Sequence, residues 1–202
     1  MATTPTATVA ELTKLLARHD SAPVTAGVPV HEVFADIFPH GLRSGAVYSL
    51  RGSMTAALAL LAGPSLAGSW CGVVGVPDLG VEAAAEWGVQ LDRLALVPRF
   101  DPADWTTVIA ALAEVTALVV AAPPDRISPG EVSRLLARLR TSGSTLVVLG
   151  PWPRAVAELT GQVVEWRGLH QGHGHLSAGR VRLEVTERHR RRQAEFAVPV
   201  RP

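Results

Sequence analysis

Residues 45–55 have the order of a nucleotide-binding loop, but the groups that would perform its chemistry are replaced. The segment reads as a buried strand, a glycine turn and the start of a helix. A working loop has the pattern G-x-x-x-x-G-K-[ST], in which backbone amides surround the phosphates, lysine contacts the terminal ones and the hydroxyl ligates magnesium. Here Ser53 follows Gly52 in the lysine position, Met54 takes the hydroxyl position, and Val47 stands where the first glycine belongs.

No lysine elsewhere in the chain is placed to compensate for this loss. Lys14 is the only lysine among the 202 residues, and it lies on a predicted helix near the N-terminus. A helix N-terminus alone stabilises an anion by about 0.3–1 kcal/mol, or up to about 2 in good geometry. Removing a poorly paired ion from water costs several kcal/mol. We therefore predict that Gly52 is a strand-to-helix turn, with no nucleotide cofactor and no enzymatic activity.

Composition limits the classes of protein that need to be considered. A hydrophobic content of 48% over this length is enough for one full core. The single cysteine, Cys71, lies in an apolar run and is expected to be a buried structural thiol. No apolar run of membrane-spanning length is present, and the start of the chain does not resemble a signal peptide. These features predict a cytoplasmic protein, and the net charge of +1 is too small to attract nucleic acid over the whole surface.

The chain is predicted to consist of an N-terminal segment, residues 1–29, and one domain, residues 30–202. Thr8 and Glu11 form a capping box at the start of an amphipathic helix. Leu12, Leu15 and Leu16 lie on its apolar face, and a linker rich in proline and glycine follows. This face docks either on the protein's own core or on a partner.

The domain alternates short apolar runs with helical patterns. Residues 73–74, 94–97, 118–121 and 146–149 are apolar without alternation, as expected for parallel strands covered on both faces. Helices are predicted after Asp101 and between Ser128 and Gly143, from their capping signals and apolar periodicity. Residues 163–166, 181–185 and 196–200 read as further strands. The fold class predicted is α/β, with a mostly parallel sheet flanked by helices and antiparallel C-terminal hairpins at one edge.

The order of these pieces resembles the RecA ATPase core. Residues 30–45 are similar to the RecA-like segment before the phosphate loop, and residues 82–94 to a RecA helix that re-enters the sheet. The resemblance implies a catalytic glutamate at the position of Pro77 and a magnesium-binding aspartate at the end of the strand that finishes at Ala121. Neither is present. The neighbouring Asp78 is expected to cap the next helix.

Among RecA relatives, the chain resembles the short actinobacterial ImuA-type (ImuA-prime) proteins. The similar segments are residues 49–53, 62–65, 68–75, 149–153 and 172–175. This resemblance implies a non-catalytic accessory role in translesion synthesis and mutagenesis during the SOS response to DNA damage. The implied partners are an ImuB-like Y-family polymerase homologue, an error-prone C-family DNA polymerase and RecA. The alternative is a RecA-like regulator of recombination or of the SOS response that binds DNA weakly or senses nucleotide.

Three further groups of residues are candidates for binding. Arg188, Arg190, Arg191 and Arg192 form a basic cluster that is either a solvated hairpin turn or a contact for DNA or an acidic partner. Trp152, between two prolines after a strand, is either a packed rim residue or an interface anchor. The histidine-containing loop has metal-compatible spacing but no cysteine, which favours a polar turn over a zinc site. Its histidines are His170, His173 and His175.

Overall fold

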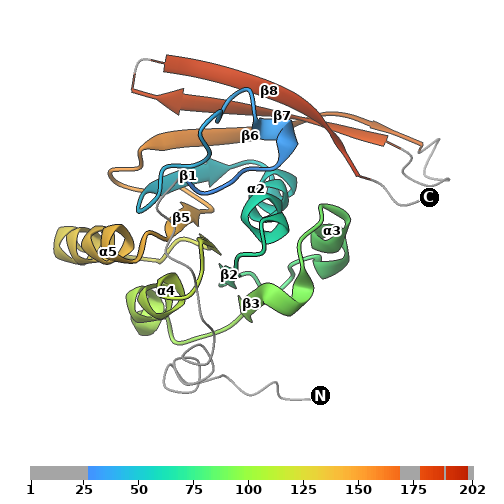
Figure 1. Cartoon of the computed structure of the whole chain (residues 1–202). Helices are drawn as coiled ribbons and strands as arrows, with labels where there is room; N and C mark the ends of the chain where they lie inside the picture. The colour runs from blue at the N-terminus through green and yellow to red at the C-terminus, as the bar shows by residue number, and fades with distance from the viewer. Residues whose placement is uncertain (1–26, 169–177, 189, 200–202) are drawn as a thin grey trace.

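The computed structural model describes residues 27–168, 178–188 and 190–199, and within these residues eight strands form one mixed sheet (Figure 1). In their spatial order the strands are β3 (Leu94–Val97), β2 (Cys71–Val74), β4 (Leu118–Ala121), β5 (Thr145–Val148), β1 (Val47–Arg51), β6 (Ala157–Arg167), β7 (Ala178–Glu187) and β8 (Arg190–Val198). All neighbours from β3 to β6 are parallel, whereas β7 pairs antiparallel with both β6 and β8. The predicted fold class is confirmed.

Helices cover both faces of the parallel strands. The described helices are α2 (Met54–Leu66), α3 (Val81–Glu86), α4 (Trp105–Ala113) and α5 (Pro129–Ser142), together with the 3-10 turns η1 (Glu32–Phe34), η2 (Leu91–Arg93) and η3 (Pro102–Asp104). One core lies between the sheet and the pair α4 and α5, and a second core contains α2. Helix α5 has an apolar stripe made by Val132, Leu135 and Leu139, which are buried.

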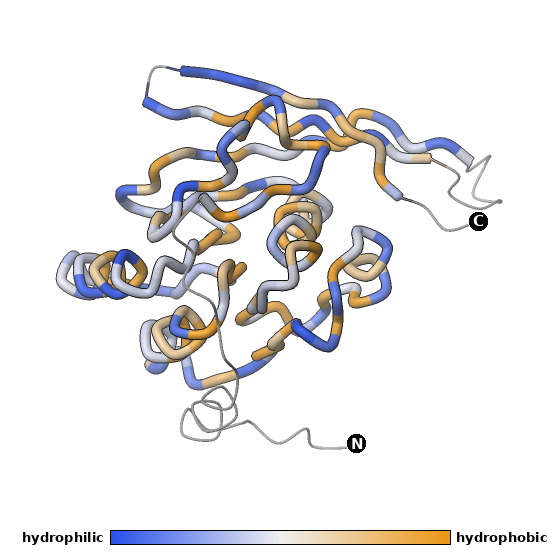
Figure 2. Tube along the Cα trace, viewed as in Figure 1, coloured by the Kyte–Doolittle hydropathy of each residue, from blue (hydrophilic) through white to orange (hydrophobic). Residues whose placement is uncertain are grey.

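Helix α2 differs from α5 because it is apolar around its whole circumference. Ten of its thirteen residues are buried, and Figure 2 shows no strongly hydrophilic face along it. A helix of this kind is buried on every side. The reason is visible in Figure 1, where the sheet curves so that β6, β7 and β8 pass over α2, and the helix contacts β2 and β4 as well as β7. The segment before β1 closes a further side, since a Cβ on Gly63 would lie 2.5 Å from the backbone of Val30.

Local capping signals were mostly predicted correctly. Ser128 and Glu131 form the capping box of α5, and Gly143 ends this helix with a left-handed backbone at φ +79°. Asp101 accepts a hydrogen bond from the Ala103 amide, at the start of η3. The prediction for Asp78 is wrong, because α3 starts after Gly80, which has no side chain to form a cap.

The C-terminal strands are longer than their apolar runs predicted. Strand β6 starts at Ala157, where it pairs with β1, and continues through a bulge between Val163 and Glu165 to pair with β7. Strand β8 starts at Arg190, so Arg190, Arg191 and Arg192 lie on a strand and not in the turn. Apolar runs do not mark these starts, because the first residues of both strands are charged or alternate in polarity.

At the other end, the body of the protein includes residues before the predicted boundary at residue 30. Val28 is fully buried and forms an isolated bridge with Leu42. The predicted N-terminal helix with Leu12, Leu15 and Leu16 lies outside the described residues, as does the histidine loop. Among the residues that are described, no helix has the length and apolar character needed to cross a membrane.

Candidate functional site

The connection between β1 and α2 occupies the phosphate-loop position and consists of only two residues, Gly52 and Ser53. Gly52 has φ +82°, a left-handed backbone that favours glycine. Strand β6 packs directly against this turn. A Cβ on Gly52 would lie 2.3 Å from the carbonyl oxygen of Gly161, and a Cβ on Gly161 would lie 2.3 Å from Cβ of Ser53.

The first turn of α2 is also capped from within the chain. The Ser53 hydroxyl accepts a hydrogen bond from the Ala56 amide at 3.1 Å, as an N-cap serine does. Met54, in the position of the metal-binding hydroxyl, is partly exposed and supplies no oxygen ligand. The three residues predicted as a degenerate phosphate loop therefore form a compact capped turn.

Two tryptophans and several prolines lie at the carboxyl ends of β4 and β5. The Trp105 indole donates a hydrogen bond to the Ala122 carbonyl, immediately after Ala121, at 2.8 Å. Trp105 also stacks on Trp152, with ring centroids 5.4 Å apart. The strand that would supply a magnesium ligand in a RecA-like ATPase thus ends in an apolar cluster.

Trp152 lies at the sheet rim, as predicted, but its side chain is 7% exposed. Its indole Nε1 is buried and has no hydrogen-bond partner among the described residues. The packed-rim alternative therefore describes its position. An indole buried to this degree presents little surface to a partner, and its role in partner binding stays a prediction.

The basic cluster is divided between the two faces of the β7–β8 hairpin. Arg188 lies in the turn with φ +47°. Arg191 lies on the outer face and forms an ion pair with Glu184. Arg190 and Arg192 lie on the inner face, where they line a pocket. Consecutive residues of a strand point to opposite faces, so one run of arginines makes two different surfaces.

On the outer face, acidic side chains pair with the arginines. The described ion pairs across β1, β6, β7 and β8 on this face are Arg51 with Glu158, Arg180 and Arg182 with Glu195, and Arg191 with Glu184. Hydrogen bonding and charge from Arg182, with a smaller effect of Arg180, lower the pKa of Glu195 below its ordinary value. Exposed pairs of this kind contribute little to stability. Their effect here is to leave the outer face without a continuous basic track.

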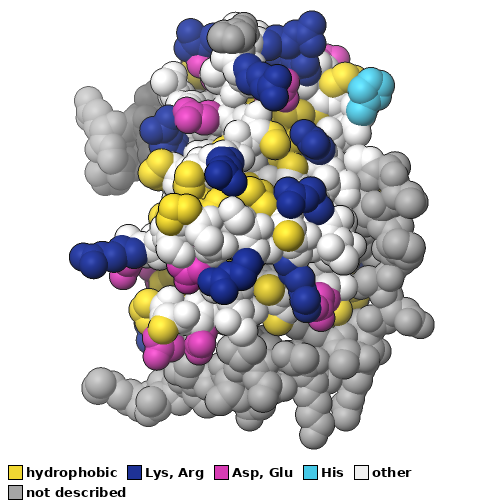
Figure 3. All heavy atoms as spheres, turned by 90° about the vertical axis from the view of Figure 1, so that its left-hand side faces the viewer, with side chains coloured by type: hydrophobic (Ala, Val, Ile, Leu, Met, Phe, Trp, Pro, Cys, Tyr) yellow, Lys and Arg dark blue, Asp and Glu magenta, His cyan; other side chains and the backbone are white. Residues whose placement is uncertain are grey.

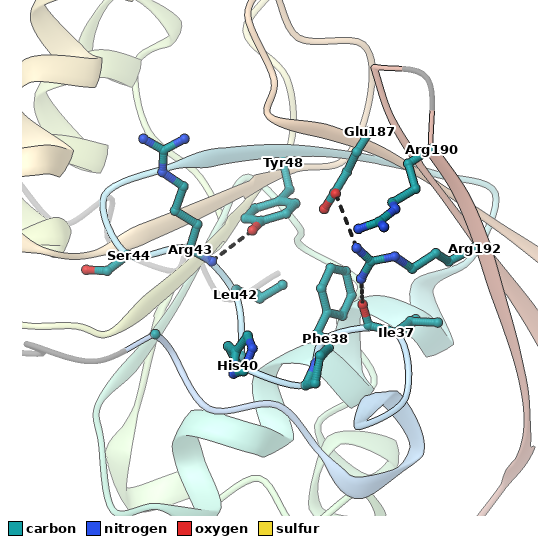
Figure 4. Close-up of a pocket in the computed structure, with 13 residues that line it drawn as sticks. Ile37, Phe38, His40, Leu42, Arg43, Ser44, Tyr48, Glu187, Arg190 and Arg192 are labelled. Atoms are coloured by element: carbon teal, nitrogen blue, oxygen red, sulfur yellow. Dashed lines mark hydrogen bonds and ion pairs between the residues drawn. The ribbon is translucent and has the colours of Figure 1, made fainter.

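The pocket on the inner face, which we call the amino-edge pocket, lies at the amino end of β1, the edge opposite the β1–α2 turn. Its volume is about 620 Å³. One wall is the segment that leads into β1, and the other is the end of β7 with the start of β8 (Figure 4). The lining residues are Gly27, Ile37, Phe38, Pro39, His40, Gly41, Leu42, Arg43, Ser44, Tyr48, Glu187, Arg190 and Arg192.

Hydrogen bonds hold the two walls of the amino-edge pocket in place. Arg192 donates from Nη1 to the Ile37 carbonyl at 2.7 Å, and its Nη2 lies 3.8 Å from a Glu187 carboxylate oxygen. The Tyr48 hydroxyl accepts from the Arg43 amide at 2.8 Å. Burial raises the pKa of Tyr48 above its ordinary value.

Comparison with known proteins places the chain in a family. It matches the model described as the MT3502 N-terminal domain over residues 36–154. It is also 34% identical, over 168 residues, to the uncharacterized protein Rv3395c of Mycobacterium tuberculosis. The aligned region covers 77% of this chain and 80% of that protein. The chain belongs to the MT3502 N-terminal domain family. A mycobacterial relative fits the expectation of an actinobacterial family.

The matched region contains the β1–α2 turn and the first wall of the amino-edge pocket, and it stops before β6. The second wall comes from the C-terminal strands. Sequence reasoning singled out Arg190 and Arg192 but missed Arg43, His40 and Tyr48, because these residues carry no motif. Within the described ranges, no group of three or more histidine, cysteine, aspartate or glutamate side chains is arranged to hold a metal ion.

Proposed function

We propose that this member of the MT3502 N-terminal domain family is a non-catalytic, RecA-like accessory protein of damage-induced translesion DNA synthesis. Its proposed partners are an ImuB-like Y-family polymerase homologue and, through it, an error-prone C-family DNA polymerase. The proposal combines the ImuA-type resemblance of the sequence with one structural observation. That observation is the two-residue β1–α2 turn, against which Gly161 of β6 packs where a phosphate loop would be.

The turn supports a non-catalytic role because phosphoryl transfer depends on positioning and charge neutralisation. A phosphate loop surrounds its ligand with successive backbone amides, which needs a longer connection than Gly52 and Ser53 provide. The Ser53 hydroxyl is already used to cap α2. The carboxyl end of β4 provides no carboxylate, since both residues at this end, Ala121 and Ala122, are alanines.

A non-catalytic accessory protein acts by binding other proteins through its surface. The fold alone does not establish that such binding occurs. The test is co-purification of the full chain with the ImuB-like protein, together with deletion of each gene in the source organism. We expect a stable complex, and loss of damage-induced mutagenesis to the same extent in both deletion strains. Failure of the intact protein to bind the ImuB-like protein would overturn the proposal.

Three variants separate the candidate contacts in the same assay. Removal of residues 1–20 tests the predicted helix with Leu12, Leu15 and Leu16. Trp152→Phe is preferable to Trp152→Ala, because deleting a buried tryptophan costs about 3–5 kcal/mol of stability and would confuse misfolding with lost binding. A variant in which Arg190, Arg191 and Arg192 are changed to alanine tests the basic cluster. Steep salt dependence of binding to DNA alone would instead favour the DNA-binding alternative.

A further inference from the structure

The amino-edge pocket contains two arginines that no carboxylate neutralises. Arg43 and Arg190 line it from opposite walls, and neither forms an ion pair among the described residues. Arg192, the third arginine of the pocket, is satisfied in part by the Ile37 carbonyl and by Glu187. The pocket therefore has a net positive charge, and two of its arginines have no ion pair among the described residues, unlike the arginines of the outer-face ion pairs.

The backbone of Arg43 is held in place before any ligand binds. Its backbone amide donates to the Tyr48 hydroxyl, and its carbonyl accepts a hydrogen bond from the Thr145 hydroxyl at 3.0 Å. Tyr48 itself is 3% exposed and packs edge-on against Phe38, with centroids 6.1 Å apart. Such preorganisation lowers the entropy lost when a ligand is bound.

The rest of the lining is mixed: His40, Ser44, Tyr48 and Glu187 are polar, and the other side chains are apolar. Ile37, Phe38 and Leu42 line the pocket beside the arginines, as Figure 4 shows. A ligand that places negative charge beside an apolar group matches the arginines and the apolar part of this lining. A peptide with acidic and apolar side chains has both.

We propose that the amino-edge pocket binds an acidic peptide segment of a protein partner, whose carboxylates pair with Arg43 and Arg190 while an apolar side chain contacts Phe38. Charge-assisted hydrogen bonds from guanidinium to carboxylate are the stronger class of protein hydrogen bond. The site lies at the opposite edge of the sheet from the phosphate-loop position. It is therefore separate from the phosphate-loop position of this chain.

A nucleic-acid backbone fits these observations less well. Its sugars would not fill the apolar part of the lining. A backbone track also needs basic side chains that continue beyond the pocket, but the outer-face arginines are paired with glutamates. On the side of the molecule shown in Figure 3, basic side chains are interspersed with acidic ones over the surface.

The test uses the full chain and a short fluorescein-labelled peptide of alternating glutamate and leucine, with anisotropy as the readout. A peptide of alternating glutamine and leucine is the control for charge, and a single-stranded oligonucleotide is the nucleic-acid arm. We expect the acidic peptide to bind with a Kd below about 1 mM and at least about tenfold more tightly than the glutamine peptide. Higher salt should weaken this binding.

The double variant Arg43→Gln with Arg190→Gln should bind the acidic peptide at least about tenfold more weakly. Arg182→Gln is the matched control, because Arg182 is an arginine of the outer face that is already paired with Glu195, and it should bind like the wild type. Equal binding by the double variant, or no binding of the acidic peptide at all, overturns the proposal. Tighter, Arg190-dependent binding of the oligonucleotide would also overturn it and would identify a nucleic-acid site.

This inference deepens the proposed function and rests on it only for the identity of the partner. Different results would contradict the proposed function and the proposed peptide site. If the ImuB-like protein co-purifies equally well with the double variant, the accessory role stands and the pocket is not the contact. If the acidic peptide binds through Arg43 and Arg190 but the ImuB-like protein does not bind, the pocket stands and the proposed partner is wrong.

Discussion

Cys71 shows how far burial can alter one side chain. The residue lies on β2 with no exposed surface, and its thiol donates to the Leu61 carbonyl at 3.7 Å. Burial raises the pKa of Cys71 to about 12. The neutral thiol is therefore the form present throughout the physiological range, and the thiolate is the form that reacts.

We predict that Cys71 does not react with Ellman's reagent at pH 8 while the protein is folded. An ordinary thiol of pKa about 8.5 is roughly a quarter ionised at that pH, whereas a thiol of pKa about 12 is ionised to about one part in ten thousand. Addition of guanidinium chloride should expose one reactive thiol per chain. Rapid labelling without denaturant would show that β2 opens readily or that the thiol is accessible.

At the same scale, the sequence predicted those interactions that depend on neighbours in the chain. Ser128, Glu131 and Gly143 are within a few residues of the amides and carbonyls that they cap, so their spacing was sufficient. The opposite is true of Arg43 and Tyr48. Their importance comes from contacts across the fold, and no local pattern marks either residue.

The contact between the β1–α2 turn and β6 is the element-scale feature that decides the function we propose. Gly161→Ala should destabilise the protein by about 1–3 kcal/mol, because the new Cβ would lie 2.3 Å from Cβ of Ser53. Urea unfolding gives the measurement. Gly130→Ala, in the first turn of α5, is the control: its Cβ would meet only the Ser128 hydroxyl at 4.0 Å. The control should be neutral or stabilising by up to about 1 kcal/mol.

The same turn predicts the outcome of an attempt to restore nucleotide binding. Ser53→Lys combined with Met54→Thr rebuilds the G-K-T end of the motif, yet it leaves two residues between β1 and α2. We expect neither the wild type nor this variant to bind magnesium ATP with a Kd below about 1 mM, or about 4 kcal/mol, in isothermal titration. Tighter binding by the wild type would refute the non-catalytic role. Tighter binding by the variant alone would show that side chains, not loop length, limit the site.

Strands differed in how well they could be predicted, and the reason is their surroundings. Strands β2, β4 and β5 have four buried residues each, so their apolar runs were found to within a residue or two. Strands β6 and β8 have one solvated face. Their polar or charged first residues, such as Glu158 and Arg190, concealed where they start.

At the scale of the whole molecule, the fold class followed from the alternation of strands and helices, but the amino-edge pocket did not. The hydrogen bond from Arg192 to the Ile37 carbonyl joins residues 155 positions apart. The two walls of the pocket come together only through the sheet order, in which β6, β7 and β8 follow β1 in succession. The spacing of residues along the chain does not predict such a contact.

Helix α2 packs inside the curve of the sheet, and this position limits where the chain can be cut into fragments. The family match ends at residue 154, three residues before β6. A fragment cut there would leave the hydrogen-bonding edge of β1 open and would uncover the side of α2 that β7 protects. Open strand edges and bare apolar helices promote aggregation. The region matched by the family model is therefore smaller than the packed unit of this chain, which includes the C-terminal strands.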